Sequence, residues 1–147
     1  MDDHTISIRK AALSDSLSIT NLCIQLGYEV TEDIIIQRLQ KITYDDNTVI
    51  YVAIQNSVII GWIQISIRSA IESGELPEIT GLVVDESFRG NGVGKKLVAK
   101  AEEWAKSLGY KSIKVRTNIL RTETHLFYKK IGFEEKKKQT VFQRSLI

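Results

Sequence analysis

The chain has 147 residues, of which 26% are charged and 43% are hydrophobic, and its formal net charge is +2. These values are typical of a globular domain that buries a full core, and the single cysteine excludes an internal disulfide. No apolar run approaches the ~20 residues that span a bilayer, the acidic start lacks the core of a signal peptide, and no concentrated basic face suggests nucleic acid. We therefore expect one domain over residues 1–147, with its core at about 5–146. We expect this domain to be cytoplasmic and to bind neither a membrane nor nucleic acid.

The first half of the chain predicts a strand, two helices and three further strands from its apolar and β-branched patterns. Their expected bounds are 5–9, 14–26, 31–41, 49–54, 58–68 and 76–84, with a hairpin turn at 55–57. Ser14 or Asp15 can cap the first helix, and Thr31 opens the second. Cys23 lies on the apolar face of the first helix, so we expect it in the core. Gly81 in the last strand suggests a bulge or a close backbone approach.

The second half begins with a glycine-rich turn at 89–94, followed by the clearest helical pattern of the chain, from Val93 to a stop at Gly109. The remaining elements expected are a strand at 112–117, a helix at 121–131 and two closing antiparallel strands at 133–137 and 140–146. Because strand, helix and strand in succession form a right-handed crossover, the strand after the long helix should lie parallel to the one before the turn. The order predicts an α/β (α+β) fold with a central mixed, mostly antiparallel twisted sheet of about seven strands flanked by about four helices.

The glycine-rich turn has the chemistry of an anion site. Gly90, Gly92 and Gly94 let the backbone approach a ligand without a Cβ in the way. The first N–H groups of the following helix point outward, with the positive end of the helix dipole behind them. We therefore expect a phosphate or a similar anion at this turn.

Spacing excludes two common phosphate motifs here. A P-loop would need a glycine where Arg89 stands and a serine or threonine where Lys96 stands. The dinucleotide fingerprint would need its last glycine where Lys95 or Leu97 stands. What remains is the pattern Arg-x-x-Gly-x-Gly over residues 89–94.

A second group of residues follows the strand predicted at 112–117. Asn118 comes first, and residues 125–133 are His-Leu-Phe-Tyr-Lys-Lys-Ile-Gly-Phe. By itself, an aromatic pair followed by Gly-Phe is more often core plus a helix C-cap. This helix nevertheless follows a strand paired to the glycine-turn strand, so its side chains can reach the edge at which open α/β sheets bind ligands.

Together the two groups resemble the motifs of the GNAT superfamily of acyl-CoA-dependent N-acetyltransferases. In that family an Arg-x-x-Gly-x-Gly turn binds pyrophosphate, and a later motif commonly contains Asn, an aromatic-Tyr pair and Gly-Phe. With the order of the strands, the resemblance covers about residues 6–146. It implies a GNAT-like domain that takes acetyl-CoA as co-substrate and passes the acetyl group directly to a primary amine in a ternary complex.

The resemblance also implies which residues bind the donor. Backbone groups of residues 82–84 would hold the pantetheine arm like an added strand, and residues 89–95 would hold the pyrophosphate. Asn118 would orient the pantetheine or a water, although it could equally cap a loop, and Lys130 could meet a CoA phosphate. The full expected set is Leu82, Val83, Val84, Arg89, Gly90, Asn91, Gly92, Val93, Gly94, Lys95, Asn118, Tyr128 and Lys130.

The chemistry requires a base and an acid. An amine with a pKa near ~10.4 is protonated at neutral pH, so a base or a water chain must remove a proton before the amine attacks. Glu78 matches the position at which some family members carry a catalytic Glu, although a solvated or paired carboxylate is an equal alternative. Tyr128 resembles the family's general acid, and its phenol could protonate the departing thiolate. A backbone N–H near Val83 could stabilise the oxyanion.

The acceptor is the least determined part of the function. Acidic residues in the first two helices and in the strand loops would favour a cationic amine, either a small molecule or a protein amine, and surface solvation explains them equally well. They are Glu29, Glu32, Asp33, Asp45, Asp46, Glu72 and Glu75. A non-catalytic acyl-CoA sensor of the same fold is the alternative function. We expect no metal, and we leave open a homodimer.

Overall fold

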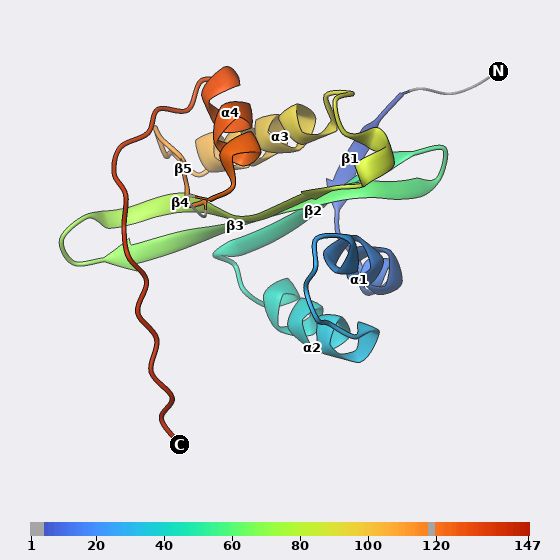
Figure 1. Cartoon of the computed structure of the whole chain (residues 1–147), viewed down its shortest axis with the longest axis horizontal. Helices are drawn as coiled ribbons and strands as arrows, with labels where there is room; N and C mark the ends of the chain where they lie inside the picture. Colours follow the sequence, from blue (N-terminus) through green and yellow to red (C-terminus); the bar gives the residue numbers. More distant parts are fainter. Residues whose placement is uncertain (1–4, 118–119) are drawn as a thin grey trace. The chain divides into compact units, whose positions relative to one another are not determined.

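Figure 1 shows the computed structural model of the chain, which describes residues 5–117 and 120–147. It divides into two units, Met1–Arg116 and Thr117–Ile147, which are described separately below. The elements in chain order are β1 (Ser7–Lys10), η1 (Leu13–Asp15), α1 (Ser16–Gln25), α2 (Glu32–Thr43), β2 (Thr48–Gln55), β3 (Val58–Ala70), β4 (Gly74–Val84), η2 (Glu86–Phe88), α3 (Val93–Ser107), β5 (Lys114–Val115) and α4 (Thr122–Lys130).

The first unit is built on a mixed sheet with the strand order β1-β2-β3-β4-β5. The first four strands are antiparallel, and β5 lies parallel to β4, as the crossover rule predicts. The expected hairpin between β2 and β3 is confirmed, because Asn56 and Ser57 have φ values of 50° and 65°, as a tight hairpin turn requires. The fold class is therefore confirmed, with five strands in the described sheet instead of about seven.

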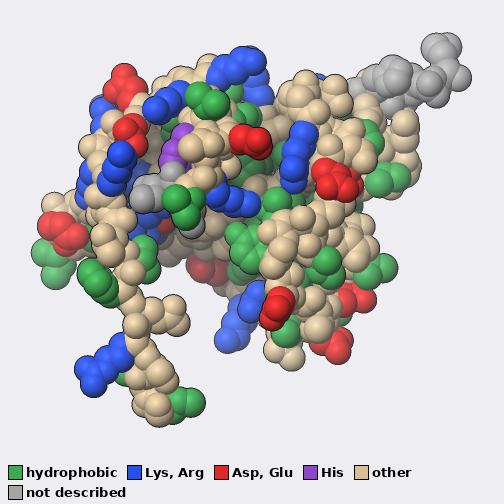
Figure 2. Space-filling view, viewed as in Figure 1, with side chains coloured by type: hydrophobic (Ala, Val, Ile, Leu, Met, Phe, Trp, Pro, Cys, Tyr) green, Lys and Arg blue, Asp and Glu red, His purple; other side chains and the backbone are tan. Residues whose placement is uncertain are grey.

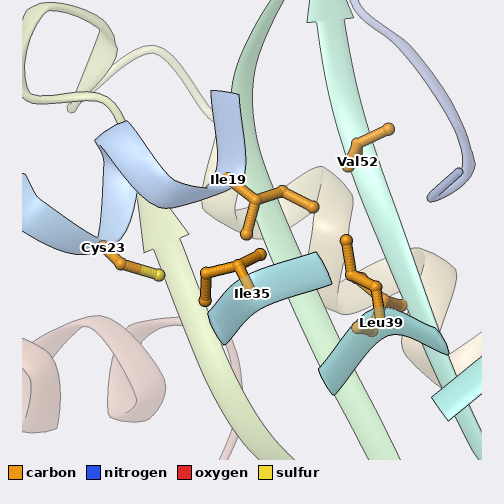
Figure 3. Close-up of a cluster of buried hydrophobic side chains, with 6 residues drawn as sticks. Ile19, Cys23, Ile35, Leu39 and Val52 are labelled. Atoms are coloured by element: carbon orange, nitrogen blue, oxygen red, sulfur yellow. The ribbon is translucent and has the colours of Figure 1, made fainter. Parts of the chain in front are cut away.

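The sheet has a helix layer on each face (Figure 1), with α3 on one side and α1 and α2 on the other. The side chains of α3 that are buried are Val93, Leu97, Val98, Ala101 and Ala105. On the opposite face, α1, α2 and β2 share a cluster made of Ile19, Cys23, Ile35, Leu39, Ile50 and Val52, most of which Figure 3 shows pointing toward one another. The expectation that Cys23 is a core residue is confirmed, and burial raises the pKa of its thiol.

The starts of the two N-terminal helices differ from each other. Thr31 caps α2 as predicted, since its hydroxyl accepts a hydrogen bond from the N–H of Ile34 at 3.3 Å. The side-chain cap expected for α1 is wrong. Asp15 stands at the N-cap position, but its carboxylate instead accepts hydrogen bonds from Arg9 at 2.7 and 2.9 Å and from the N–H of Ala12. A charged bidentate partner on β1 outcompetes the helix N–H groups for this carboxylate.

The predicted bulge at Gly81 is confirmed, and the group that approaches this glycine closely is a side chain instead of the backbone. The register of β3 and β4 shifts there, because Gln64 pairs with Gly81 and Ile65 pairs with Ile79, which leaves Thr80 as the extra residue of a bulge. A Cβ on Gly81 would lie 2.7 and 2.8 Å from two carbons of the Trp62 ring. The bulge is therefore packed tightly under an aromatic side chain.

The second unit contains α4 and an extended C-terminal segment. The two closing strands expected at 133–137 and 140–146 are wrong, since residues 133–147 contain no strand. Four consecutive charged residues, 134–137, disfavour the first strand. The alternating pattern of the second is typical of a strand, but it forms no ladder within this chain.

Gly81→Ala should lower the free energy of unfolding by about 1–3 kcal/mol, because the added methyl group must displace the Trp62 ring. Combining Gly81→Ala with Trp62→Leu should give a protein more stable than the sum of the two single effects, since the smaller side chain leaves room. Denaturant unfolding of the wild type, both single variants and the double variant measures this coupling. If the changes in the free energy of unfolding of the two single variants add up to that of the double variant within about 0.5 kcal/mol, the close contact between Gly81 and Trp62 is contradicted.

Candidate functional site

The bulge in β4 leaves one edge of this strand open. Within the described residues, β5 pairs with β4 only at Glu78 and Ile79, whereas β3 follows β4 to Val84. From Thr80 to Val84, no described strand pairs with the edge of β4 that faces away from β3. Alternate backbone N–H and C=O groups along such an edge can bind an extended ligand as an additional strand.

A close packing contact holds this part of β4 in position. A Cβ on Gly61 of β3 would lie 2.9 Å from the carbonyl oxygen of Val83 and 3.2 Å from a methyl carbon of Leu97. The absence of a side chain at Gly61 therefore lets β4 lie against β3 and beneath α3 at the same point. The open edge is rigidly supported on its other side.

The glycine-rich turn follows directly after β4 and η2. Gly90 and Gly92 have φ values of 84° and 81°, in the left-handed region that favours glycine, and a Cβ at either position would meet no atom within 4 Å. Gly92 is the N-cap of α3, and no side chain caps this helix. The first N–H groups of a 15-residue helix are thus left for a ligand.

The entry to the turn is fixed by hydrogen bonds. The carboxylate of Asp85 accepts from the N–H of Ser87 at 2.8 Å and from the side-chain amide of Gln25 in α1 at 3.2 Å. These contacts hold the pKa of Asp85 below its ordinary value, the N–H of Ser87 being the largest cause. Arg89 is exposed and donates from Nε to the carbonyl oxygen of Val84 at 3.3 Å, so its guanidinium is held beside the end of β4.

Glu78 is a buried carboxylate between two arginines. Its side chain is only 7% exposed, and Arg68 of β3 donates to its Oε2 at 3.0 Å. The Nε of Arg116 lies 2.9 Å from its Oε1, which is an ion-pair contact without hydrogen-bond geometry, so Oε1 has no hydrogen-bond partner in the described part of the chain. Glu78 is therefore a paired carboxylate and not a solvated one, and its role as a base stays a prediction. Neither arginine was expected from the sequence, although alternation along 58–68 assigns Arg68 to the polar positions.

Tyr128 lies in the second unit, in the last turn of α4. Its ring makes edge contacts with the rings of Phe127 and Phe133, with centroids 5.1 and 5.2 Å apart, and burial raises the pKa of the phenol to about 12. The N–H groups of Gly132 and Phe133 bond the carbonyl oxygens of Lys129 and Tyr128, which is a Schellman cap. The core-plus-cap interpretation of this motif is therefore correct. The same arrangement fixes the Tyr128 ring at the end of the helix.

The other expected site residues are distributed as follows. Val93, Gly94 and Lys95 form the first turn of α3, and Asn91 is exposed in the loop before it. Lys130 is exposed at the end of α4. Asn118 lies outside the described residues.

Three of the seven acids suggested for a cationic acceptor accept hydrogen bonds within the fold. Glu32 accepts from the hydroxyl of Ser16, Asp45 accepts from Asn47 and Thr48, and Glu75 accepts from the phenol of Tyr110. These three carboxylates are therefore occupied by the fold itself. Among residues 5–117 and 120–147, no group of three His, Cys, Asp or Glu side chains could hold a metal ion, and no helix is long and apolar enough to cross a membrane.

Known proteins resemble the chain in sequence. The family described as "Acetyltransferase (GNAT) family" matches residues 17–133. An uncharacterized N-acetyltransferase of Methanocaldococcus jannaschii is 41% identical over 68 residues, which are 46% of this chain and 30% of that protein. The aminoalkylphosphonate N-acetyltransferase of Salmonella typhimurium is 32% identical over 92 residues, 62% of this chain and 60% of that protein. The chain thus matches less than two thirds of the length of these two relatives.

Solved structures share the fold over nearly the whole chain. An aminoglycoside N-acetyltransferase, AAC(6')-Iy in complex with CoA, has a TM-score of 0.86 at 24% identity, covering 97% of this chain and 96% of its own. Glucosamine-6-phosphate N-acetyltransferase from Arabidopsis thaliana has a TM-score of 0.81 at 28% identity, covering 97% and 100%. The resemblance found in the two sequence motifs is confirmed by a family match across both of them, and the chain belongs to the GNAT family of acetyltransferases.

Proposed function

We propose that the protein transfers an acetyl group from acetyl-CoA to a primary amine, by direct attack of the amine in a ternary complex. The observation that carries this proposal is the open edge of β4 running directly into an uncapped, glycine-rich start of α3. The open edge of β4 can bind an extended chain of amides, and the start of α3 can bind an anion. Acetyl-CoA joins these two chemistries in one molecule, and the relatives above are named N-acetyltransferases.

The donor site follows from these two features. Backbone groups of residues 82–84 bind the amides of the pantetheine arm, and the N–H groups of residues 90–95 bind the pyrophosphate. Arg89 adds a positive charge at the junction, because its contact with the carbonyl of Val84 keeps the guanidinium beside the end of the strand. Asn118 orients the pantetheine or a water, and Lys130 pairs with a CoA phosphate.

In the reaction, the amine nitrogen attacks the thioester carbonyl, a backbone N–H near Val83 stabilises the oxyanion, and the carbon–sulfur bond breaks. Glu78 takes the proton that the amine loses, directly or through water. Tyr128 donates to the departing thiolate and recovers its proton from solvent, so the products are the amide and free CoA thiol. The raised pKa of Tyr128 keeps its phenol protonated throughout the neutral range.

A sensor that binds acetyl-CoA without using it is the second candidate. The pairing of Glu78 with two arginines favours it, since a carboxylate occupied in this way can be purely structural. The two functions differ in one measurement, the release of free CoA thiol with a panel of amines. Release that depends on the amine supports the transferase, whereas binding without release under every amine supports the sensor.

The whole chain would act as one domain, because the family match at 17–133 crosses the division between the two units.

We further propose that two copies associate through the C-terminal segment. Val141, Phe142 and Leu146 are 90%, 90% and 94% exposed, and Figure 2 shows hydrophobic side chains uncovered along this segment. An extended apolar segment without a ladder partner is a strand-pairing site for a second copy.

Arg89→Glu should weaken acetyl-CoA binding at least about tenfold, because it puts a negative charge beside the pyrophosphate. Calorimetric titration gives the Kd, and the melting temperature without ligand checks the fold. Lys111→Glu, an equal charge reversal at an exposed loop residue, is the matched control and should bind acetyl-CoA like the wild type. An unchanged Kd in Arg89→Glu would contradict our position for the pyrophosphate.

The acid and base roles predict a loss of kcat. Glu78→Gln and Tyr128→Phe should each lower kcat for thiol release by about 10²–10⁴-fold, and in Glu78→Gln the Kd for acetyl-CoA should stay unchanged. Glu78→Asp keeps the negative charge between the two arginines, so it shows whether the loss of kcat in Glu78→Gln comes from a disturbed fold. Full activity in either Glu78→Gln or Tyr128→Phe removes the role of that residue.

Truncation after Lys138 should convert a dimer to a monomer in sedimentation equilibrium, since it removes the exposed apolar residues of the segment. The control is Ile71→Ser, which removes a fully exposed apolar side chain elsewhere and should leave the dimer intact. A full-length chain that sediments as a monomer at all concentrations would refute the association.

A further inference from the structure

We infer that the amine acceptor carries an anionic group of the phosphonate, phosphate or carboxylate class, and that Arg68 and Arg116 bind this group. The inference rests on the proposed acetyl transfer and names the acceptor of the same site. The charge of this acceptor group is opposite to the charge of the cationic acceptor that the loop acids suggest. The charged side chains on one face of the sheet, beside the bulge, favour the anionic group.

Glu78, Arg68 and Arg116 form a charged cluster, and the strand register puts it on the face of the sheet that α1 and α2 cover. Glu78 pairs with Ser66, and Ser66 pairs with Thr48, which is two residues before the buried Ile50 of the α1–α2 cluster. Paired residues, and residues two apart in a strand, share a face. Arg68 therefore lies on this face, and so does Lys114, the partner of Glu78 on β5.

The charges that β3, β4 and β5 bring to this face are unbalanced, and the carboxylate of Asp45 contacts Thr48 on β2, one strand beyond β3. Strand β3 contains no acidic residue, β5 contains none, and β4 contains Glu75 and Glu78. Glu75 is three positions from Glu78 and so lies on the opposite face, where its carboxylate accepts from Tyr110 at 2.8 Å. One carboxylate thus faces Arg68, Arg116 and Lys114, which leaves a net positive charge among these strands.

The arginines are accessible although the carboxylate is not. Arg68 and Arg116 have side chains that are 54% and 51% exposed, compared with 7% for Glu78. A guanidinium has five N–H donors, and the contacts with Glu78 involve Nη1 of Arg68, which donates, and Nε of Arg116, which makes an ion-pair contact. Glu78 therefore holds two half-exposed guanidinium groups that have further donors for a ligand. Two such groups match the oxygens of an oxyanion and bind it better than lysines would.

The cluster lies at the right place along β4 to bind an acceptor. Glu78 is two residues before Thr80, where the open edge begins, and three residues before Gly81, a separation of about 10 Å along a strand. The long side chains of Arg68 and Arg116 can extend toward the bulge, so the anionic group and the reacting amine can lie closer together than this distance. An acceptor whose amine and anion are a few bonds apart can therefore contact the arginines while its nitrogen approaches a thioester at the bulge.

The test compares pairs of amine acceptors of which one member carries the anionic group and the other does not. Thiol release at saturating acetyl-CoA is measured with 2-aminoethylphosphonate against its neutral diethyl ester, and with glucosamine 6-phosphate against glucosamine. In at least one pair the anionic member should have a kcat/KM at least about tenfold higher, mostly through KM. Arg68→Gln and Arg116→Gln should each reduce this ratio about tenfold or more, whereas Lys41→Gln, an equal charge change on α2, should not.

A higher kcat/KM for the neutral member of both pairs, or for spermidine over all four, would overturn the inference. So would a ratio that Arg68→Gln and Arg116→Gln leave unchanged. Arg68→Lys, which keeps the charge but not the fork of donors, should fall between Arg68→Gln and the wild type, and melting temperatures identify any variant that fails to fold.

A separate binding measurement distinguishes failure of this inference from failure of the proposed function. If acetyl-CoA binds but no amine releases thiol, the transferase is wrong. Calorimetric titration with 2-aminoethylphosphonate and with glucosamine 6-phosphate, on the wild type and on Arg68→Gln, then decides the inference independently. Binding of either compound that weakens about tenfold in the variant supports the anion site, and the absence of binding of both to the wild type refutes it.

Discussion

The arrangement of the site depends on how β4 is paired. Strand β3 holds β4 along its whole length, whereas β5 holds it only at Glu78 and Ile79 within the described residues. The pairing with β5 stops just before the bulge at Thr80, and the Trp62 ring packs closely against Gly81 in this bulge. An edge of unpaired backbone groups is ordinarily a liability in a folded protein. Here the open edge is followed by the glycine turn, and we propose that the two together bind the donor.

A second constraint acts through Glu78. A buried carboxylate is unfavourable unless it is paired, and removing one partner leaves a charge that the interior cannot solvate. Arg68 and Arg116 come from β3 and from the end of β5, so this carboxylate ties the two neighbours of β4 together at the position where they begin to separate. The ion pairs thus link the stability of the sheet to the charge of the surface beside the bulge.

The parts predictable from sequence were those that local chemistry decides. Thr31 caps its helix, the glycines at 90 and 92 have positive φ, and Gly81 marks a bulge, because each depends on a few neighbouring residues. The Asp15 carboxylate is a local error, because its partner Arg9 lies on β1 only six residues before it. Most errors concern pairing between segments far apart in the chain, since β5 stops after two residues and the alternating residues 140–146 find no ladder. Arg116 was missed for the same reason, since only the parallel pairing of β4 and β5 brings it to Glu78.

The central claim is that the open edge of β4 and the start of α3 bind one molecule of acetyl-CoA. Hydrogen exchange of the backbone amides, followed by mass spectrometry with and without acetyl-CoA, tests it most directly, because both features are sets of N–H groups. We predict that acetyl-CoA slows exchange at residues 82–84 and at 90–95 together, while the hairpin turn at 55–57 exchanges as before. Protection at neither segment under saturating acetyl-CoA, or protection confined to other parts of the chain, would contradict the account.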